Sequence, residues 1–170
     1  MPSSPGPAVP PAEPPTAGRA DEAGWLSEDE MAAWLPLLRI LLQLPQELDR
    51  QLRETAGLNH AHYTVLSILS AQPDRTMPMS DLSRTSSLSL SRLSHAVSSM
   101  EARGWISRTP SPRNRRVQHV QLTGAGAAML DAVAPGHVRE VRRLVFDRLT
   151  DNDVADLRRV GLKVLAALDG

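Results

Sequence analysis

The pattern of apolar and polar positions in the first third of the chain predicts one long helix. Ser27 precedes a run of acidic residues, and Glu30 lies three positions after it, which is typical of a helix N-terminus. We expect this helix to continue to about Thr55. Its apolar residues cover more than one face, which indicates more than one packing partner; they are Met31, Trp34, Leu35, Leu37, Leu38, Leu41, Leu42, Leu44, Leu48 and Leu52.

Two shorter helices are predicted in the centre of the chain. Residues 59–70 carry apolar side chains at helical spacing and end before Pro73. A second, shorter helix is predicted over residues 80–85, followed by a turn at residues 86–88. A short helix and a tight turn before another helix are typical of a helix-turn-helix. Met79, Leu82 and Leu88 are the expected core residues of this part.

The helix after this turn has one apolar side and one polar side. It is expected to begin after Ser89 as N-cap and to end at Gly104. Its apolar stripe is Leu90, Leu93, Val97 and Met100, and the residues between are Ser91, Arg92, Ser94, His95, Ser98 and Ser99. Short hydroxyl side chains let a helix approach a polar surface, and serine and arginine contact bases and phosphates. The alternative is a solvent-exposed helix that is rich in serine.

Two short β-branched segments, 105–109 and 117–123, predict a hairpin. The loop between them contains Arg113, Arg115 and Arg116 and no acidic residue. Such a loop suits the phosphate backbone, with one arginine reaching the minor groove. The alternative is a charged loop that keeps an edge hairpin soluble.

The C-terminal part predicts two more helices. Thr123 is the expected N-cap of a helix to about Leu149, bent at Pro135, and residues 150–153 are expected to cap the last helix. The apolar excess of both helices indicates a dimerisation platform, because so many exposed leucines would otherwise promote aggregation. The predicted fold is therefore mainly α (α+β): a winged helix-turn-helix with a two-stranded wing and a helical dimerisation platform from both ends of the chain.

Composition and charge add to this picture. Residues 1–27 are rich in proline and alanine, which predicts a disordered extension. Eight arginines and two acidic residues lie between Arg75 and Gln118, although the net charge of the whole chain is zero; this gives a local basic patch. The chain has no cysteine, which excludes disulfides and thiolate metal sites. No apolar run is long enough to span a membrane, so we expect a cytoplasmic protein.

From about Ala33 to Leu168, four-fifths of the chain, the sequence resembles the MarR (multiple antibiotic resistance regulator) family of bacterial transcriptional regulators. The stretches that carry the resemblance are LNHAHYTVLSIL, MSDLSRTSSLSLSRLSHAVSSMEARGWISR, the arginine-rich loop, VQLTGAGAAML and APGHV. Members are homodimers of winged helix-turn-helix subunits. They are usually repressors, and a small ligand often releases them from DNA. One departure concerns the wing: the family usually has Asp-x-Arg, whereas this chain has Asn114 two positions before Arg116, and Asn114 cannot form the ion pair.

The resemblance implies a division of the chain and a set of site residues. Residues 28–57 and 124–170 form the dimerisation helices, and residues 58–123 form the DNA-binding domain. The predicted DNA-binding residues are Ser87, Ser89, Ser91, Arg92, Ser94, His95, Ser98, Arg113, Arg115 and Arg116. A ligand pocket is implied between the dimerisation helices and the DNA-binding domain. Its candidates are Trp34, His60, His62 and Tyr63, with His137 nearby, for a phenolic or other aromatic acid; each is also explained as a packing or surface residue.

Catalysis, a metal and a cofactor are not expected. His60 and His62 are two positions apart in a helix and so point about 200° apart, too far to chelate one ion. The chain has no HExxH motif, no nucleophile elbow and no phosphate-binding glycine loop. The predicted function is a sequence-specific transcriptional regulator, a ligand-responsive repressor that binds double-stranded DNA as a homodimer on a pseudo-palindromic operator. Two alternatives are a winged helix that binds protein instead of DNA and a small-molecule-binding scaffold.

Overall fold

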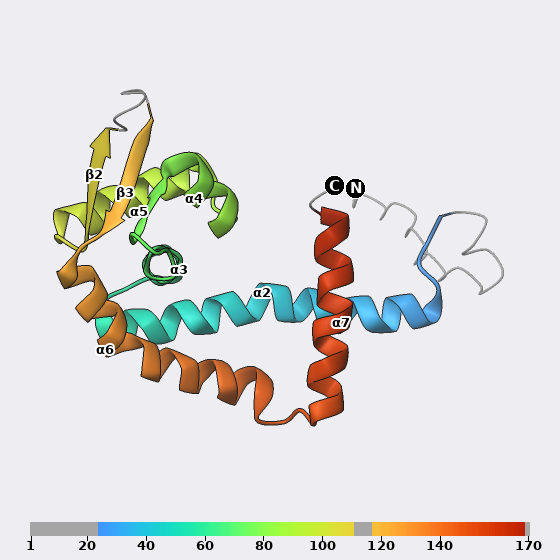
Figure 1. The fold of residues 1–170 in the computed structure, drawn as a ribbon. Helices are drawn as coiled ribbons and strands as arrows, with labels where there is room; N and C mark the ends of the chain where they lie inside the picture. Colours follow the sequence, from blue (N-terminus) through green and yellow to red (C-terminus); the bar gives the residue numbers. More distant parts are fainter. Residues whose placement is uncertain (1–23, 111–116, 169–170) are drawn as a thin grey trace, which may run out of the picture. The chain divides into compact units, whose positions relative to one another are not determined.

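The computed structural model describes residues 24–110 and 117–168, so the predicted N-terminal extension up to residue 23 and the tip of the predicted wing lie outside the described residues. The chain comprises two compact units, one ending at Gln43 and the other beginning at Leu44. Described residues are mostly helical, with a small three-stranded sheet (Figure 1). The predicted fold class, a mainly α winged helix, is confirmed.

Helix α2 (Glu28–Ala56) begins as the sequence predicts. The backbone N–H of Ser27 donates to Glu30 Oε2 at 2.8 Å, and the backbone N–H of Glu30 donates to Ser27 Oγ at 3.2 Å, a reciprocal cap. In the unit that ends at Gln43, the large apolar side chains are mostly exposed: Trp25, Leu26, Met31, Trp34, Leu35, Leu37, Ile40, Leu41 and Leu42. They form an apolar surface that the described residues of this unit do not cover.

The second unit contains the hydrophobic core. The C-terminal half of α2 contributes Leu48 and Leu52, and α3 (His60–Ser70) contributes Val65, Leu66 and Leu69. Other buried residues come from the helix-turn-helix, the sheet, the start of α6 and the connections before α3 and β2: Leu58, Leu82, Leu93, Ala96, Val97, Met100, Trp105, Ile106, Val120, Leu122, Leu130 and Val133. Helix α3 contacts α4, α5, β3 and α6 and therefore lies at the centre of this core.

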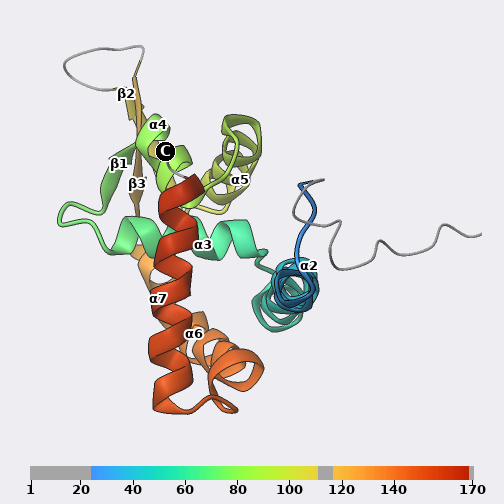
Figure 2. The ribbon, with the colours of Figure 1, turned by 90° about the vertical axis from the view of Figure 1, so that its right-hand side faces the viewer.

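The helix-turn-helix consists of α4 (Met79–Ser86) and α5 (Leu90–Ala102). Ser87 ends α4 in the left-handed conformation, with φ of 55°. The turn is held by Ser83, whose hydroxyl donates to the Leu88 carbonyl at 2.7 Å. Leu82 is fully buried, and Met79 and Leu88 pack against the core as partly buried residues, which confirms the three predicted core positions. Figure 2 shows α4 and α5 beside the hairpin.

The sheet has three antiparallel strands in the order β1-β3-β2. The predicted hairpin is present as β2 (Ile106–Pro110) and β3 (Gln118–Leu122), with Arg108 opposite Val120. Strand β1 (Thr76–Pro78) pairs with the other side of β3, and the sequence did not predict it. Three residues, one of them a proline, are too few to show the alternation of apolar and polar side chains by which a strand is predicted.

The C-terminal helices are α6 (Gly124–Val141) and α7 (Asp151–Leu168). The predicted helix to Leu149 is wrong in its second part, because the α-helix ends at Val141 and a π-helical turn follows over Arg142–Phe146. The N–H of Asp147 donates to the Arg142 carbonyl at 2.8 Å, five residues back, so the backbone follows a wider turn there. Among the described residues, no helix is long and apolar enough to cross a membrane.

Candidate nucleic-acid interface

Helix α5 separates a buried side from an exposed polar side. Leu93, Ala96, Val97 and Met100 are buried. The residues predicted to contact DNA from this helix are all exposed: Ser91, Arg92, Ser94, His95 and Ser98. Ser87 and Ser89 before the helix are exposed as well, and Ser89 Oγ accepts from the backbone N–H of Arg92 at 3.3 Å. The structure therefore brings seven of the ten predicted contact residues to one face, and their contact with DNA stays a prediction.

Leu90 corrects the predicted apolar stripe. It is 61% exposed, whereas Ala96, which the stripe omitted, is buried. The exposed face of α5 therefore begins with an apolar group followed by hydroxyl groups.

The arginines of the basic region differ in whether a carboxylate neutralises them. Arg84 forms an exposed ion pair with Asp81 at 3.0 Å, and Arg108 is paired with Glu101. Arg92 forms no ion pair with any residue that the structure describes. Its guanidinium charge is therefore not neutralised by a described carboxylate, which suits contact with a base or a phosphate.

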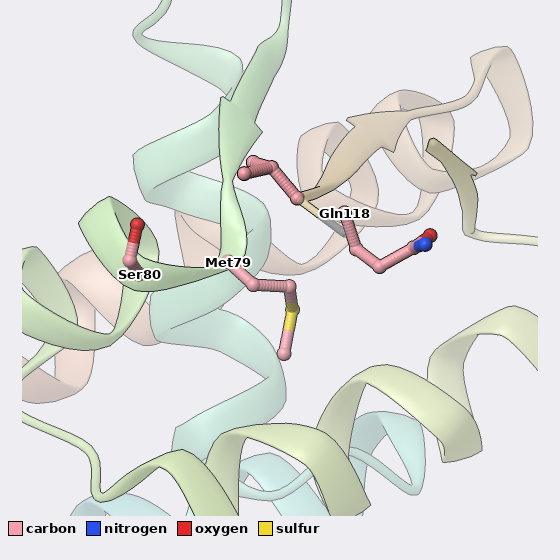
Figure 3. Close-up of a pocket in the computed structure, with 4 residues that line it drawn as sticks. Met79, Ser80 and Gln118 are labelled. Atoms are coloured by element: carbon pink, nitrogen blue, oxygen red, sulfur yellow. The ribbon is translucent and has the colours of Figure 1, made fainter. Parts of the chain in front are cut away.

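The wing arginines Arg113, Arg115 and Arg116, and Asn114, lie outside the described residues. The base of the hairpin is described. A hollow of about 230 Å³ lies there, lined by Met79 and Ser80 of α4 and by Val117 and Gln118 of the hairpin. Figure 3 shows that the Ser80 hydroxyl does not point toward the Gln118 amide, so the two polar groups do not converge on one point.

A larger groove lies beside α5 in the unit that begins at Leu44. It has a volume of about 400 Å³ and is lined by α2, α3 and the α4–α5 turn: Pro45, Gln46, Asp49, Arg53, Asn59, His60, Ala61, Thr64, Ser86, Leu88 and Arg92. Asp49 accepts from Arg53 at 2.7 Å and from the backbone N–H of His60 at 2.8 Å. His60, a predicted ligand candidate, and Arg92, a predicted DNA contact, therefore line the same groove.

Three ring side chains form a cluster behind this groove. His137 of α6 is buried and lies 4.1 Å from Tyr63 and 6.0 Å from His60, measured between ring centroids. His137 Nδ1 lies 3.1 Å from Gln51 Oε1 of α2. Burial lowers the pKa of His137, and the neighbouring His60 lowers it further. Burial is also the main reason that the pKa of His60 is lowered, and His60 Nδ1 has no described hydrogen-bond partner.

His62 belongs to a different environment. Its Nδ1 accepts from the backbone N–H of Asn59 at 3.4 Å, and its ring packs edge-on against Trp105. Burial and the Arg103 guanidinium lower the pKa of His62. His60 and His62 therefore diverge as predicted, and His62 is a capping and packing residue. Trp34 lies in the other unit, where it is partly exposed.

Sequence reasoning missed two parts of this region. Asp49 and Arg53 line the groove, but an acid and a base four residues apart are ordinary on a helix surface and gave no signal. The pairing of Glu101 with Arg108 joins α5 to β2, and only the turn at Gly104 hinted that the two residues approach each other. Among the residues described, no group of three His, Asp or Glu side chains is arranged to hold a metal ion.

Comparison with known proteins supports a regulator. The sequence model of the MarR family matches residues 56–117, which include α3, the helix-turn-helix and β2. Among curated relatives, the transcriptional repressor MprA of Escherichia coli K12 is 26% identical over 136 residues, covering 78% of this chain and 77% of its own.

Two solved structures from Streptomyces coelicolor are similar over most of the chain. AbsC, a MarR family transcriptional regulator, is 33% identical with a TM-score of 0.80, covering 86% of this chain and 98% of its own. Sco3205, a MarR family regulator solved in complex with DNA, is 37% identical with a TM-score of 0.82, covering 86% of this chain and 91% of its own. Identity at this level over nearly whole chains exceeds what a shared fold alone requires. The chain belongs to the MarR family of transcriptional regulators.

Proposed function

We propose that this regulator binds double-stranded DNA as a homodimer and that each subunit inserts α5 into the major groove of one half-site. The observation that carries the proposal is the exposed face of α5, which presents hydroxyl groups, Arg92 and His95 opposite a fully packed side. Two half-sites about 34 Å apart would form a pseudo-palindrome. The DNA complex of Sco3205 supports this arrangement, because that protein shares the fold and more than a third of its residues.

The residues divide into two roles. Ser87 and Ser89 precede α5, and with the helix N-terminus they suit a phosphate. The residues proposed to face the major groove of the DNA are Ser91, Arg92, Ser94, His95 and Ser98. Arg92 can pair there with guanine O6 and N7. Arg113, Arg115 and Arg116 of the wing are proposed to contact the neighbouring backbone and minor groove. Family membership favours this function over the protein-binding winged helix.

The homodimer is proposed from apolar surface that a single chain leaves exposed. Helix α7 buries none of its residues, and Val154, Leu157, Val160, Leu162, Val164, Leu165 and Leu168 are exposed. The first half of α2 exposes a similar set. Surfaces of this kind are typical of subunit interfaces. We therefore assign residues 28–57 and 124–170 to dimerisation and residues 58–123 to DNA binding.

A small-molecule effector is proposed for the groove beside α5. Arg53, His60 and Arg92 supply donors or positive charge, and Pro45, Ala61 and Leu88 supply apolar surface. An aromatic carboxylic acid matches both, and its size suits a volume of about 400 Å³. An acid bound to Arg92 would withdraw that side chain from DNA. Such a ligand shifts the equilibrium by the difference between its affinities for the free and DNA-bound protein, which makes the regulator a ligand-released repressor.

The test is binding of the full-length protein to a duplex that it selects from a randomised library, followed by fluorescence anisotropy against a scrambled duplex. The proposal predicts preferential binding, a steep dependence on salt and two subunits per duplex. Equal binding to both duplexes at every salt concentration would contradict sequence-specific regulation. Salicylate and benzoate are suitable first effectors, with benzyl alcohol as the uncharged control.

A further inference from the structure

The hairpin leaves the hydrophobic core at Arg108. In β2 only Ile106 is buried, and the residues from Arg108 to Pro110 are exposed. In β3, Val120 opposite Arg108 is buried, whereas Gln118 opposite Pro110 is exposed. Beyond the Arg108–Val120 pair, the strands are held to each other by backbone hydrogen bonds but are not packed into the core. Strand β1 pairs with β3 as far as His119, so the contacts of Arg108 hold the other strand, β2, at the point where the hairpin leaves the core.

Glu101, in the last turn of α5, holds Arg108 from the helix side. Glu101 Oε1 accepts from the backbone N–H of Arg108 at 3.2 Å, and Oε2 accepts from Arg108 Nε at 2.8 Å and from Nη2. Both side chains are 35% exposed, so water screens the attraction in part. A guanidinium that donates two bonds to one carboxylate, together with the backbone bond, restricts orientation as well as separation.

We propose that Glu101 is a positioning residue for DNA binding, which sets the angle at which the hairpin leaves the core relative to α5. The proposal rests on the proposed function, in which α5 and the wing contact the same duplex. Residues 111–116 follow Pro110 in the chain, so the base of the hairpin sets the point from which they continue.

The identity of residue 114 increases the importance of this contact. The wing has Asn114 where the family usually has an aspartate, and asparagine cannot form an ion pair with Arg116. Glu101–Arg108 is the ion pair that joins α5 to the hairpin among the residues that the structure describes. The hydrogen bond from Arg108 is the main cause of the lowered pKa of Glu101.

Charge and positioning predict opposite effects when Glu101 is neutralised. Removing a carboxylate from a basic surface increases its attraction for DNA, so charge alone would make Glu101→Gln bind more tightly. Loss of positioning makes the same variant bind more weakly, because the wing arginines no longer contact the phosphates when α5 lies in the major groove of the DNA. The sign of the change therefore separates the two causes.

The experiment measures the Kd of the full-length protein on a duplex of about 30 base pairs, long enough for two half-sites, selected by the wild-type protein. We expect Glu101→Gln to raise the Kd by about tenfold. The slope of log Kd against log salt concentration should decrease by about one to two ions, because one or two phosphate contacts are lost. Glu140→Gln is the control: it breaks an arginine–carboxylate pair on α6, in which Arg143 Nε and Nη2 donate to the two carboxylate oxygens of Glu140 at 2.9 and 2.6 Å. The control should change the Kd by less than twofold. Thermal unfolding of each variant shows whether it is folded.

A variant without the three wing arginines separates positioning from a general loss of structure. In a protein with Arg113→Ala, Arg115→Ala and Arg116→Ala, adding Glu101→Gln should change the Kd by less than twofold, because no wing arginine remains to be positioned. Tighter or unchanged binding by Glu101→Gln overturns the positioning role, and so does a full tenfold loss that persists without the wing arginines. A wild-type protein that selects no duplex overturns the proposed function, and the role of Glu101 with it.

Discussion

His137 Nδ1 lies 3.1 Å from Gln51 Oε1, so a buried histidine of α6 is joined to the C-terminal half of α2. The contact connects α2 and α6, the two helices that come before and after the helix-turn-helix in the chain. The ring of Tyr63 of α3 packs against the same imidazole at a centroid distance of 4.1 Å. Helices α2, α3 and α6 therefore meet at one titratable group.

The first prediction concerns the pH dependence of folding. Burial lowers the pKa of His137, His60 and His62, so protonation favours the unfolded chain. The stabilising effect is complete above the ordinary histidine pKa and is lost as the pH falls through the lowered values in the folded protein. We expect the urea midpoint to decrease between pH 7.5 and pH 5. His137→Phe keeps the contact with Tyr63 but cannot titrate, so the urea midpoint of this variant should depend less on pH. A midpoint that depends on pH as in the wild type would contradict the role of His137. His95→Asn, at an exposed position, is the control.

The second prediction concerns Arg92. Arg92→Ala should reduce discrimination between the selected and the scrambled duplex by roughly 1–3 kcal/mol if the guanidinium pairs with a guanine. The measurement is the ratio of the two Kd values at one salt concentration. An unchanged ratio with weaker binding to both duplexes would assign Arg92 to phosphate. Arg84→Ala, which removes an arginine already paired with Asp81, is the comparison.

The third prediction concerns the wing. Arg116→Ala should weaken binding to all duplexes and reduce the salt slope by about one ion, because a phosphate or minor-groove contact is lost. The measurement is the Kd over a salt series from low to physiological concentration. A variant with the slope of the wild type would show that Arg116 does not contact DNA.

The fourth prediction concerns the start of α6. A Cβ added at Gly126 would lie 2.0 Å from the backbone carbonyl oxygen of Trp105, which cannot move aside like a flexible side chain. Gly126→Ala should therefore lower the free energy of unfolding by roughly 1–3 kcal/mol or more. Gly124→Ala, two residues earlier, meets nothing within 4 Å and serves as the control. Equal stability of the two variants in urea unfolding would contradict the close approach.

The fifth prediction concerns assembly. Leu165 on α7 is 55% exposed in the single chain, and we propose that a second subunit covers it. Leu165→Glu would place a charge in that interface, so the variant should sediment as a monomer at concentrations at which the wild type is a dimer. Arg159→Glu, on the same helix, introduces the same side chain in place of an arginine that pairs with Asp156 at the helix surface. Dissociation by Leu165→Glu that Arg159→Glu does not reproduce would locate the interface on the apolar side.

The sequence by itself determined the local structure. Ser27, Ser89, Thr123 and Thr150 cap helices as predicted, because a cap depends on residues within one turn of each other. The buried and exposed sides of α5 also followed from its period, with Leu90 as the exception. The predicted family and its winged helix-turn-helix fold were confirmed. The elements of this fold follow one another directly along the chain, so their order can be recognised in the sequence.

Only the tertiary structure decided which distant residues meet. The contacts of His137 with Gln51 and of Glu101 with Arg108 join residues on different elements, and no period or spacing in the sequence specifies such a pair. Strand β1 exists because β3 provides its hydrogen-bond partners, not because its three residues favour extended backbone. Local patterns record the preferences of neighbouring residues, whereas a site is created when folding brings separate segments within a few ångströms and removes the water between them.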